Sequence, residues 1–310
     1  MTLRTAVIGA GHLGRYHAQK YAVLPSSQFV GIADVSPEAR AKLADELKTQ
    51  AFADYRELLG RVDAVSIATP TPHHYEIARA FLEAGAHVLV EKPITTTLDE
   101  ARSLIDVAAQ AGRVLQVGHV ERFNPGILAL DRVLKTPRFV ESHRLAPFKQ
   151  RGTDVNVVLD LMIHDIDIIQ NIVHAPIASL DAIGTSVFSG GLDIANARIR
   201  FSNGCVANTT ASRVSLKTER KLRIFQDDAY MSVDLQQKIL TVVRKSDAPP
   251  EGELPQVRID EQAFEQGDAL KSQIESFLEC AAQGREPLVT GEDGLRALET
   301  AIRITEQVAG

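Results

Sequence analysis

The 310-residue chain contains only two cysteines, Cys205 and Cys280, whose separation fits neither a disulfide framework nor a metal site. No apolar run approaches the roughly 18 residues that a membrane-spanning helix needs. Basic residues are not in excess, since 34 Lys and Arg against 40 Asp and Glu give a net charge of −6. This balance argues against nucleic acid or an anionic membrane as the partner. Because the first strand is expected near Leu3, no room is left for a signal peptide, and we expect a cytoplasmic protein.

The first 118 residues alternate between short β-branched runs and longer helical patterns. Such alternation is the sequence form of a doubly wound parallel sheet. We therefore predict an α/β, Rossmann-type domain over residues 1–120. Its expected strands are Leu3–Gly9, Gln28–Asp34, Ala51–Ala53, Val62–Thr69, Ala86–Val90 and Arg113–Gly118, and its expected helices are His12–Leu24, Pro37–Lys48, Pro72–Ala84 and Leu98–Ala111.

After Gly118 the pattern changes to helices mixed with alternating apolar and polar runs. A period of two, as in Ala195–Phe201, predicts half-buried strands, and turn signals such as Asn203-Gly204 predict antiparallel pairing. We predict a second, α+β domain over residues 121–310 with a large, mostly antiparallel open sheet. Its other expected elements are a strand at Arg138–Ala146 and helices near Pro125–Leu134, Val155–Val173, Asp268–Gln283 and Gly291–Val308.

A glycine-rich turn is expected directly after the first strand. Gly9-Ala10-Gly11-His12-Leu13-Gly14 has the G-x-G-x-x-G pattern between a strand and a helix, which predicts a dinucleotide site formed by these residues. The helix N-terminus would offer its N–H groups to the pyrophosphate. Twenty residues after Gly14, Asp34 ends the second strand, where a carboxylate binds ribose hydroxyls and repels a 2′-phosphate. NAD is therefore predicted rather than NADP; the alternative is a glycine turn required only by packing.

The fourth predicted strand ends in Ala68-Thr69-Pro70. Since strand carboxyl ends line the cofactor crevice, Thr69 and Pro70 are predicted to border the nicotinamide half of the cofactor. The next helix carries His73 and His74, which as adjacent helical residues do not face one side and so do not suggest a metal site. Capping or surface roles are the alternative for both histidines.

The fifth predicted strand ends in Glu91-Lys92-Pro93. The proline has no N–H and restricts the backbone before it, so Lys92 is expected in a constrained turn. A lysine held beside a cofactor can shift its pKa and transfer protons. The alternative is a salt-bridged surface loop.

A third polar group is expected on the helix near Val155–Val173. Asp160, His164 and Asp167 fall at i, i+4 and i+7, which places all three on one helical face among strongly apolar neighbours. Such a polar stripe is costly unless it meets partners or a ligand. The alternative is a terminal carboxylate and a core histidine with satisfied hydrogen bonds.

Together these motifs resemble the Gfo/Idh/MocA oxidoreductases, which act mainly on sugars, cyclitols and related polyols. The resemblance covers essentially the whole chain and includes the glycine turn, Thr69-Pro70 with His74, Glu91-Lys92-Pro93, and Asp160-x-x-x-His164-x-x-Asp167. It implies that Lys92, Asp160 and His164 line the substrate site beside the nicotinamide, and that the exposed second-domain sheet serves a dimer or tetramer. The family's asparagine after Thr-Pro is Thr71 here, which affects cofactor contacts more than chemistry.

The residue types suit oxidation of a secondary alcohol. His164 is the better candidate for the base because histidine titrates near neutrality. Lys92 would orient and polarise the hydroxyl, with Asp160 orienting either cation. The roles of Lys92 and His164 could be exchanged.

Two polar stretches bear on the substrate. One stretch includes Arg122 and Asn124, and the other, before the catalytic helix, includes Lys149 and Arg151. Arginine suits phosphate oxygens, so these four residues, with Lys92, Asp160 and His164, are predicted to bind a nucleotide sugar. The stretches are similar to those of bacterial family members that oxidise UDP-sugars. Solvated edge-strand charges are the alternative, and an inositol or free-sugar dehydrogenase or a non-catalytic nucleotide sensor also stays open.

Overall fold

The computed structural model describes residues 2–148, 155–246, 256–265 and 267–309. The chain forms two compact units. The first unit comprises Met1–Val120 and Asp268–Arg296, and the second comprises Glu121–Gly267 and Ala297–Gly310. The predicted domains, residues 1–120 and 121–310, did not include this return of Asp268–Arg296 to the first unit.

The first unit contains a six-stranded sheet in the order β3-β2-β1-β4-β5-β6, with every neighbouring pair parallel. The predicted doubly wound sheet is therefore confirmed, and its order reverses between β1 and β4. Ligands of such sheets bind at this reversal, outside the carboxyl ends of the strands. The strands are β1 (Leu3–Ile8), β2 (Ser27–Ala33), β3 (Gln50–Phe52), β4 (Ala64–Ile67), β5 (His87–Glu91) and β6 (Leu115–Gly118).

The crossover segments between these strands begin and end where the sequence supplies caps. Ser36 accepts a hydrogen bond from Ala39 N at the start of α2, and Thr97 forms a capping box with Glu100 at the start of α4. Gly112 ends α4 with a φ of 62°, a conformation that favours glycine. The segments are α1 (His12–Val23), α2 (Pro37–Leu47), η1 (Tyr55–Leu58), η2 (Thr71–His73), α3 (His74–Glu83) and α4 (Leu98–Ala111).

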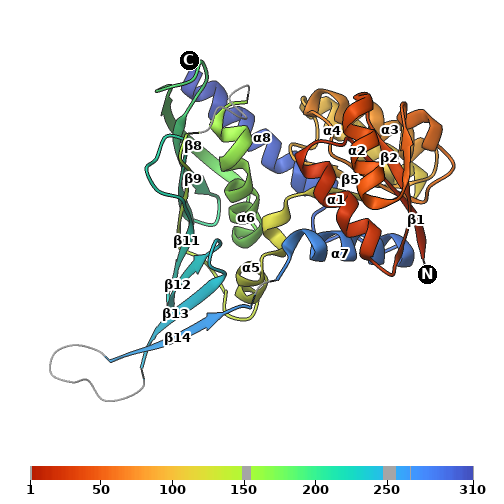
Figure 1. Cartoon of the computed structure of the whole chain (residues 1–310). Coiled ribbons are helices and arrows are strands. Elements are labelled where there is room, and N and C mark those ends of the chain that lie inside the picture. The colour runs from red at the N-terminus through yellow and green to blue at the C-terminus, as the bar shows by residue number, and fades with distance from the viewer. Residues whose placement is uncertain (1, 149–154, 247–255, 266, 310) are drawn as a thin grey trace. The chain divides into compact units, whose positions relative to one another are not determined.

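The helix α7 (Ala269–Gln283) returns to the first unit because its apolar face completes that unit's core. Ile274, Phe277 and Leu278 are buried in one cluster with Leu3 and Tyr21, residues of β1 and α1. Figure 1 shows the blue α7 beside the red α1. Burying these three apolar side chains of α7 contributes several kcal/mol, at about 1.5–3 kcal/mol each. The following helix, α8 (Gly291–Ala309), begins in the first unit and ends in the second.

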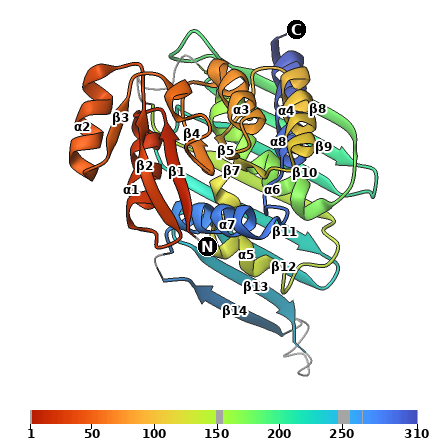
Figure 2. The same ribbon diagram turned by 90° about the vertical axis from the view of Figure 1, so that its right-hand side faces the viewer.

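The second unit is built on an eight-stranded sheet in the order β14-β13-β12-β11-β7-β10-β9-β8, whose successive strands can be followed in Figure 2. Among these neighbours only β7 and β10 pair in parallel, so the mostly antiparallel sheet is confirmed. The strands are β7 (Phe139–Leu145), β8 (Ile177–Thr185), β9 (Ile194–Phe201), β10 (Val206–Ser212), β11 (Glu219–Gln226), β12 (Ala229–Asp234), β13 (Ile239–Lys245) and β14 (Val257–Ala263).

One face of this sheet is covered by helices. Ile166 and Ile169 of α6 (Ile163–Val173) are buried in the same core as Ala197 and Ile199 of β9. Two predicted helices differ from the structure. The helix expected over Pro125–Leu134 ends at Leu130, and the one expected over Val155–Val173 begins with a π-helical turn. The additional segments are η3 (Val120–Phe123), α5 (Pro125–Leu130) and the π-helix η4 (Val158–Met162).

Candidate active site

The glycine turn connects β1 to α1 and has three glycines with different requirements. Gly9 has a φ of 102°, and a Cβ there would lie 2.7 Å from Ala68 O. A Cβ on Gly14 would lie 1.8 Å from Gly9 O. Protein packing therefore demands glycine at both positions. A Cβ on Gly11 would meet no described protein atom within 4 Å, so packing does not require glycine there, and the open space is compatible with the predicted approach of a pyrophosphate to the start of α1.

Asp34 follows β2 and braces the same turn. Its Oδ2 accepts a hydrogen bond from Ala10 N at 2.6 Å, and its Oδ1 accepts one from Ser36 N at 2.7 Å. Each carboxylate oxygen has a second lone pair, so the predicted bonds to ribose hydroxyls are compatible with these contacts. Arg40 donates to the carbonyls of Asp34 and Val35, at 3.1 and 3.2 Å.

A cavity of about 530 Å³ lies against the glycine turn, in the first unit. It contains five of the predicted cofactor residues: Gly9, Gly11, Asp34, Thr69 and Pro70. Its size and position at the carboxyl edge of the sheet suit the adenosine half of a dinucleotide. The other polar side chains that line it are Asp54, Tyr55, Arg56, His73 and Glu76. Sequence reasoning missed the first three because the weak third strand before them gave no motif.

The remaining predicted cofactor residues lie on neighbouring segments. His12 and Leu13 form the first turn of α1, where the His12 ring contacts Tyr16 edge-on at 5.0 Å between centroids. His74 is buried, and its ring nitrogens lie 2.9 Å from Thr69 O and 2.9 Å from Pro93 O. Burial lowers the pKa of His74, against the effect of these carbonyls. His74 therefore links the end of β4 to the segment after β5, and its contact with the cofactor stays a prediction.

Glu91 is the last residue of β5, and it is buried. His17 Nε2 of α1 lies 2.9 Å from Glu91 Oε1. The alternative of a salt-bridged surface loop is therefore wrong. Lys92 is half-buried and follows at the carboxyl edge of the sheet, with a cis peptide bond to Pro93. This edge is where the fold binds its ligands, as the Lys92 prediction requires.

Asp160 and His164 lie in the second unit and are both half-buried. Asp160 is in the π-helix η4, whereas His164 is in the first turn of α6. The prediction of one regular α-helix through Asp160, His164 and Asp167 was wrong, because a π-helical turn is wider than an α-helical one. Asp167 is buried and its Oδ1 accepts a hydrogen bond from Arg122 Nη1 at 3.3 Å.

The structure describes only two of the four residues that the polar stretches contribute to the predicted substrate site. Arg122 is buried against Asp167. Asn124 is also buried: it caps α5 by accepting from Gly126 N at 3.0 Å, and its amide donates to Leu235 O at 2.9 Å. Lys149 and Arg151 lie outside the described residues. A role of these four residues in substrate binding stays a prediction.

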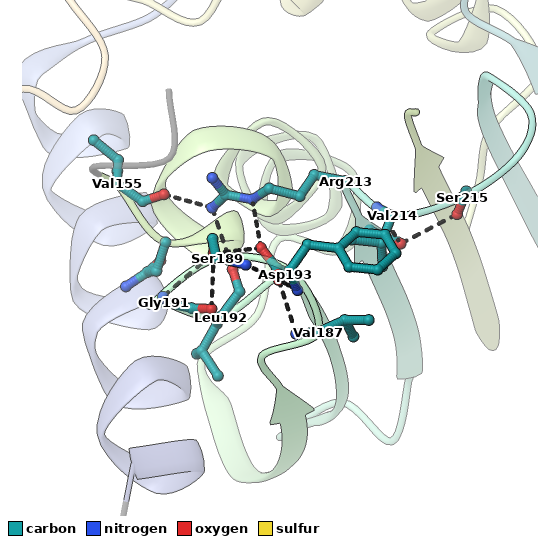
Figure 3. A network of polar contacts seen from close by, with 12 residues as sticks. Val155, Val187, Ser189, Gly191, Leu192, Asp193, Arg213, Val214 and Ser215 are labelled. Carbon is teal, nitrogen blue, oxygen red and sulfur yellow. Dashed lines mark hydrogen bonds and ion pairs between the residues drawn. The ribbon is translucent and has the colours of Figure 1, made fainter. Parts of the chain in front are cut away.

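Sequence reasoning did not predict a network around the buried residues Asp193 and Arg213, which lies at the start of η4 (Figure 3). The Asp193 carboxylate accepts hydrogen bonds from the backbone N–H groups of Val187, Phe188 and Ser189 at 2.6–2.9 Å and from Ser189 Oγ at 2.5 Å. Arg213 lies 3.7 Å from the same carboxylate.

Arg213 also connects this network to the start of η4. It donates to Val155 O, two residues before the cap of η4, and to Leu192 O at 3.2 Å. Leu192 O in turn accepts from Val157 N at 3.0 Å. The network therefore anchors the segment that leads into Asp160. A sequence signal for it was absent because its members come from three separate strands and loops.

Asp193→Asn is expected to destabilise the second unit by about 1–3 kcal/mol, because the amide would turn a donor towards Arg213 and Ser189. Burial opposes ionisation, but the Ser189 and backbone donors hold the pKa of Asp193 well below its ordinary value. Its stabilisation is therefore present above the unfolded-state pKa and is lost as pH falls through the folded-state pKa. Urea unfolding tests this, with Ser189→Ala as the milder control. Equal stability of Asp193→Asn and the wild type would contradict it.

A glycine turn at the reversal of a doubly wound sheet, with a carboxylate after β2, defines the class of dinucleotide-binding oxidoreductases. Residues 3–119 match the oxidoreductase family with an NAD-binding Rossmann fold, and residues 136–232 match the Gfo/Idh/MocA C-terminal domain. The chain belongs to the Gfo/Idh/MocA oxidoreductase family.

Individual relatives extend this similarity over the whole chain. The chain is 41% identical over 303 residues to UDP-N-acetylglucosamine 3-dehydrogenase of Acidithiobacillus ferrooxidans, covering 97% of this chain and 96% of that protein. A solved structure of that organism's UDP-N-acetylglucosamine 3-dehydrogenase matches with a TM-score of 0.94 and 40% identity over 99% of this chain and 98% of the other. The chain is also 27% identical to scyllo-inositol 2-dehydrogenase (NAD⁺) of Bacillus subtilis, over 98% and 93% of the two chains.

The predictions of the family, the fold class, NAD as cofactor and dehydrogenase activity are confirmed. In the described part of the chain, no group of three or more His, Cys, Asp or Glu residues could hold a metal ion. No helix among the described residues is long and apolar enough to cross a membrane.

Proposed function

We propose that this chain oxidises the C3 hydroxyl of UDP-N-acetylglucosamine to a ketone. The observation that carries the proposal is its similarity along nearly its whole length to UDP-N-acetylglucosamine 3-dehydrogenase. The chain also retains Lys92, Asp160 and His164, the three residues of the family motifs that suit alcohol oxidation. The glycine turn and Asp34 fit NAD, which when bound supplies the acceptor for the hydride leaving C3.

The proposed roles of the residues follow from their chemistry. His164 takes the hydroxyl proton, because an imidazole accepts protons near neutral pH. The Lys92 ammonium donates a hydrogen bond to the same oxygen and favours its developing negative charge. Asp160, four residues before His164, orients the cationic groups. Exchange of roles between Lys92 and His164 is the remaining alternative within this mechanism.

The UDP moiety requires cationic and hydrogen-bonding groups. We assign this role to Arg122, Asn124, Lys149 and Arg151, since guanidinium and ammonium groups pair with diphosphate oxygens. Arg122 already pairs with Asp167, so its charge reaches a substrate only if that pair is shared or rearranged.

The 3-keto product suits a subsequent transamination. An aminotransferase would convert the ketone to an amine, giving a 2,3-diamino sugar for the amide-linked acyl chains of lipid A and lipopolysaccharide. We place this step in the cytoplasm, as UDP-sugar precursors require. A homo-oligomer, either a dimer or a tetramer, formed through the exposed face of the second sheet completes the proposal.

A substrate panel tests the proposed activity. Purified protein with NAD is expected to form NADH with UDP-N-acetylglucosamine and to form much less with UDP-glucose, UDP-N-acetylgalactosamine or myo-inositol. Because oxidation of an alcohol by NAD is unfavourable at equilibrium, a carbonyl-trapping reagent is included. In a parallel reaction without the trap, reduction of the ketone with borodeuteride is expected to place deuterium at C3, which NMR identifies.

The other outcomes discriminate between the alternatives. NADH formation with myo-inositol but not with UDP-N-acetylglucosamine would assign the chain to the polyol dehydrogenases. Tight binding of a nucleotide sugar without NADH formation would favour a non-catalytic sensor. Deuterium at C4 instead of C3 would contradict the assigned position of oxidation.

A further inference from the structure

A buried pair joins the glycine-turn helix to the strand that precedes Lys92. His17 lies on α1 and is 0% exposed, and Glu91 ends β5 and is 7% exposed. The His17 Nε2 atom is 2.9 Å from Glu91 Oε1. Both residues belong to the first unit, and neither was predicted to interact with the other.

The surroundings of the pair indicate its protonation state. Within the described residues, His17 Nδ1 has no hydrogen-bond partner. A doubly protonated ring would bury an N–H without an acceptor, which costs about 1–3 kcal/mol. The favoured state is therefore a neutral ring that donates from Nε2 to an ionised Glu91 carboxylate. Such a donor stabilises a carboxylate that burial alone would tend to neutralise.

A glycine on the adjacent strand provides the space for this carboxylate. Gly118 of β6 is paired in register with Glu91. A Cβ on Gly118 would lie 2.7 Å from Glu91 Oε1 and 2.9 Å from Oε2. The carboxylate is therefore confined between the His17 ring and the backbone of β6. It cannot take another position without breaking the bond to His17 or leaving the buried space.

The charge of Glu91 lies next to Lys92 in the chain. Burial would raise the pKa of Glu91, but the His17 hydrogen bond and the positive charge of Lys92 hold it below its ordinary value. Interaction between two charges is mutual, so an ionised Glu91 favours the ammonium form of Lys92. The titratable groups around Glu91 are His17 of α1, His74 of α3 and Lys92 itself, with His119 following Gly118 after β6.

We propose that His17 is a positioning residue for Lys92: by fixing Glu91 as a carboxylate, it holds the end of β5 in place and keeps Lys92 an ammonium. This inference rests on the proposed function of Lys92 and deepens it. It assigns the polarising role to Lys92 and leaves proton removal to His164. It also connects α1, whose N-terminus is predicted to bind the pyrophosphate, to the segment that carries the lysine.

Two variants of His17 test the inference. His17→Leu removes the hydrogen-bond donor to Glu91. Its kcat is expected to fall about 10- to 100-fold, with little change in the KM for NAD or for UDP-N-acetylglucosamine. Without the hydrogen bond, burial raises the pKa of Glu91. As the pH is lowered, Glu91 is then protonated, and the activity that needs its ionised form is lost, at a higher pH than in the wild type. The acidic limb of the plot of kcat against pH is therefore expected to move to higher pH. His17→Gln retains an amide donor and is expected to restore the limb towards that of the wild type.

The controls separate this inference from the proposed function. If Lys92→Met keeps its turnover, the proposed role of Lys92 fails. If Lys92→Met is inactive but His17→Leu keeps the wild-type kcat and acidic limb, only the present inference is overturned. The inference is also overturned if the kcat of His17→Leu falls by the same factor at every pH and in proportion to the folded fraction of the variant, measured by circular dichroism. If His17→Leu does not fold, Glu91→Gln decides: it keeps the size and the acceptor, and a wild-type kcat there overturns the inference.

Discussion

Replacing Lys92 with methionine is expected to lower kcat by roughly 10²- to 10⁴-fold while NAD still binds. Methionine keeps most of the length and apolar volume of the side chain but removes the ammonium that would stabilise the developing charge on the substrate oxygen. NAD binding is expected to persist because Gly9, Gly11 and Asp34, which line the dinucleotide cavity, are unchanged. Turnover is measured by NADH absorbance, and affinity by the fluorescence of added NADH.

An exposed lysine provides the matched control for this prediction. Lys42 lies on the exposed face of α2, so Lys42→Met loses the same charge without touching the sheet edge. It is expected to keep wild-type turnover. Undiminished kcat in Lys92→Met would remove Lys92 from the mechanism, and loss of NADH binding would show that the lysine holds the cofactor instead.

The first sheet could be predicted from the sequence because its signals are local. Each strand is a short apolar run, and the turn at Gly9–Gly14 has a pattern that only a strand followed by a helix explains. Asp34 could be found from its distance along the chain, since the length of one βαβ unit fixes where the second strand ends. The position of Lys92 at a strand end followed from the same reasoning.

The partners of these motif residues could not be predicted, because they are distant in the sequence. His17 and Glu91 are 74 residues apart, and nothing in either segment specifies the other. The space at Gly118 is visible only once β5 and β6 are paired. Likewise, α7 returns to the first unit through apolar contacts with β1 and α1, and an amphipathic pattern shows that a helix has a buried face but not what covers it.

The departure at η4 has a different origin. The apolar pattern around Asp160 and His164 predicted a helix, and a helix is present, but periodicity over a few residues does not distinguish an α-helical from a π-helical turn. Single π-turns inside helices occur frequently at functional sites. The π-helical turn here contains Asp160, a residue for which the family motif had already suggested a function.

Replacing Arg144 with methionine is expected to reduce the free energy of unfolding by about 3–5 kcal/mol. Arg144 of β7 is buried, and its Nη1 lies 2.9 Å from Glu121 Oε1 while its Nη2 lies 2.7 Å from Asp165 Oδ1. Both carboxylates are buried as well. Methionine fills much of the space but leaves two buried negative charges without their shared cation. Denaturant unfolding at neutral pH measures the loss.

Two further variants make this test specific to the buried charges. Arg220 also approaches Glu121, at 3.4 Å, but its side chain is 49% exposed. Arg220→Met is therefore expected to cost at most about 1 kcal/mol. Adding Glu121→Gln and Asp165→Asn to Arg144→Met removes the uncompensated charges and is expected to recover much of the lost stability. Equal losses in Arg144→Met and Arg220→Met would contradict the central role of Arg144.

The pH dependence of the Arg144→Met defect distinguishes buried charge from lost packing. In the wild type, burial opposes ionisation of Glu121, but Arg144 holds its pKa below the ordinary value, so its stabilisation is lost as pH falls through that pKa. The pKa of Asp165 is raised, since burial outweighs Arg144 and its Oδ2 finds no donor among the described residues. Without Arg144, the folded-state pKa values of Glu121 and Asp165 both rise. The destabilisation caused by their buried charges is then relieved as the pH falls through these raised pKa values, because the folded state takes up protons first. The difference in stability between the variant and the wild type is therefore expected to shrink between neutral pH and about pH 5, whereas a packing defect would remain constant.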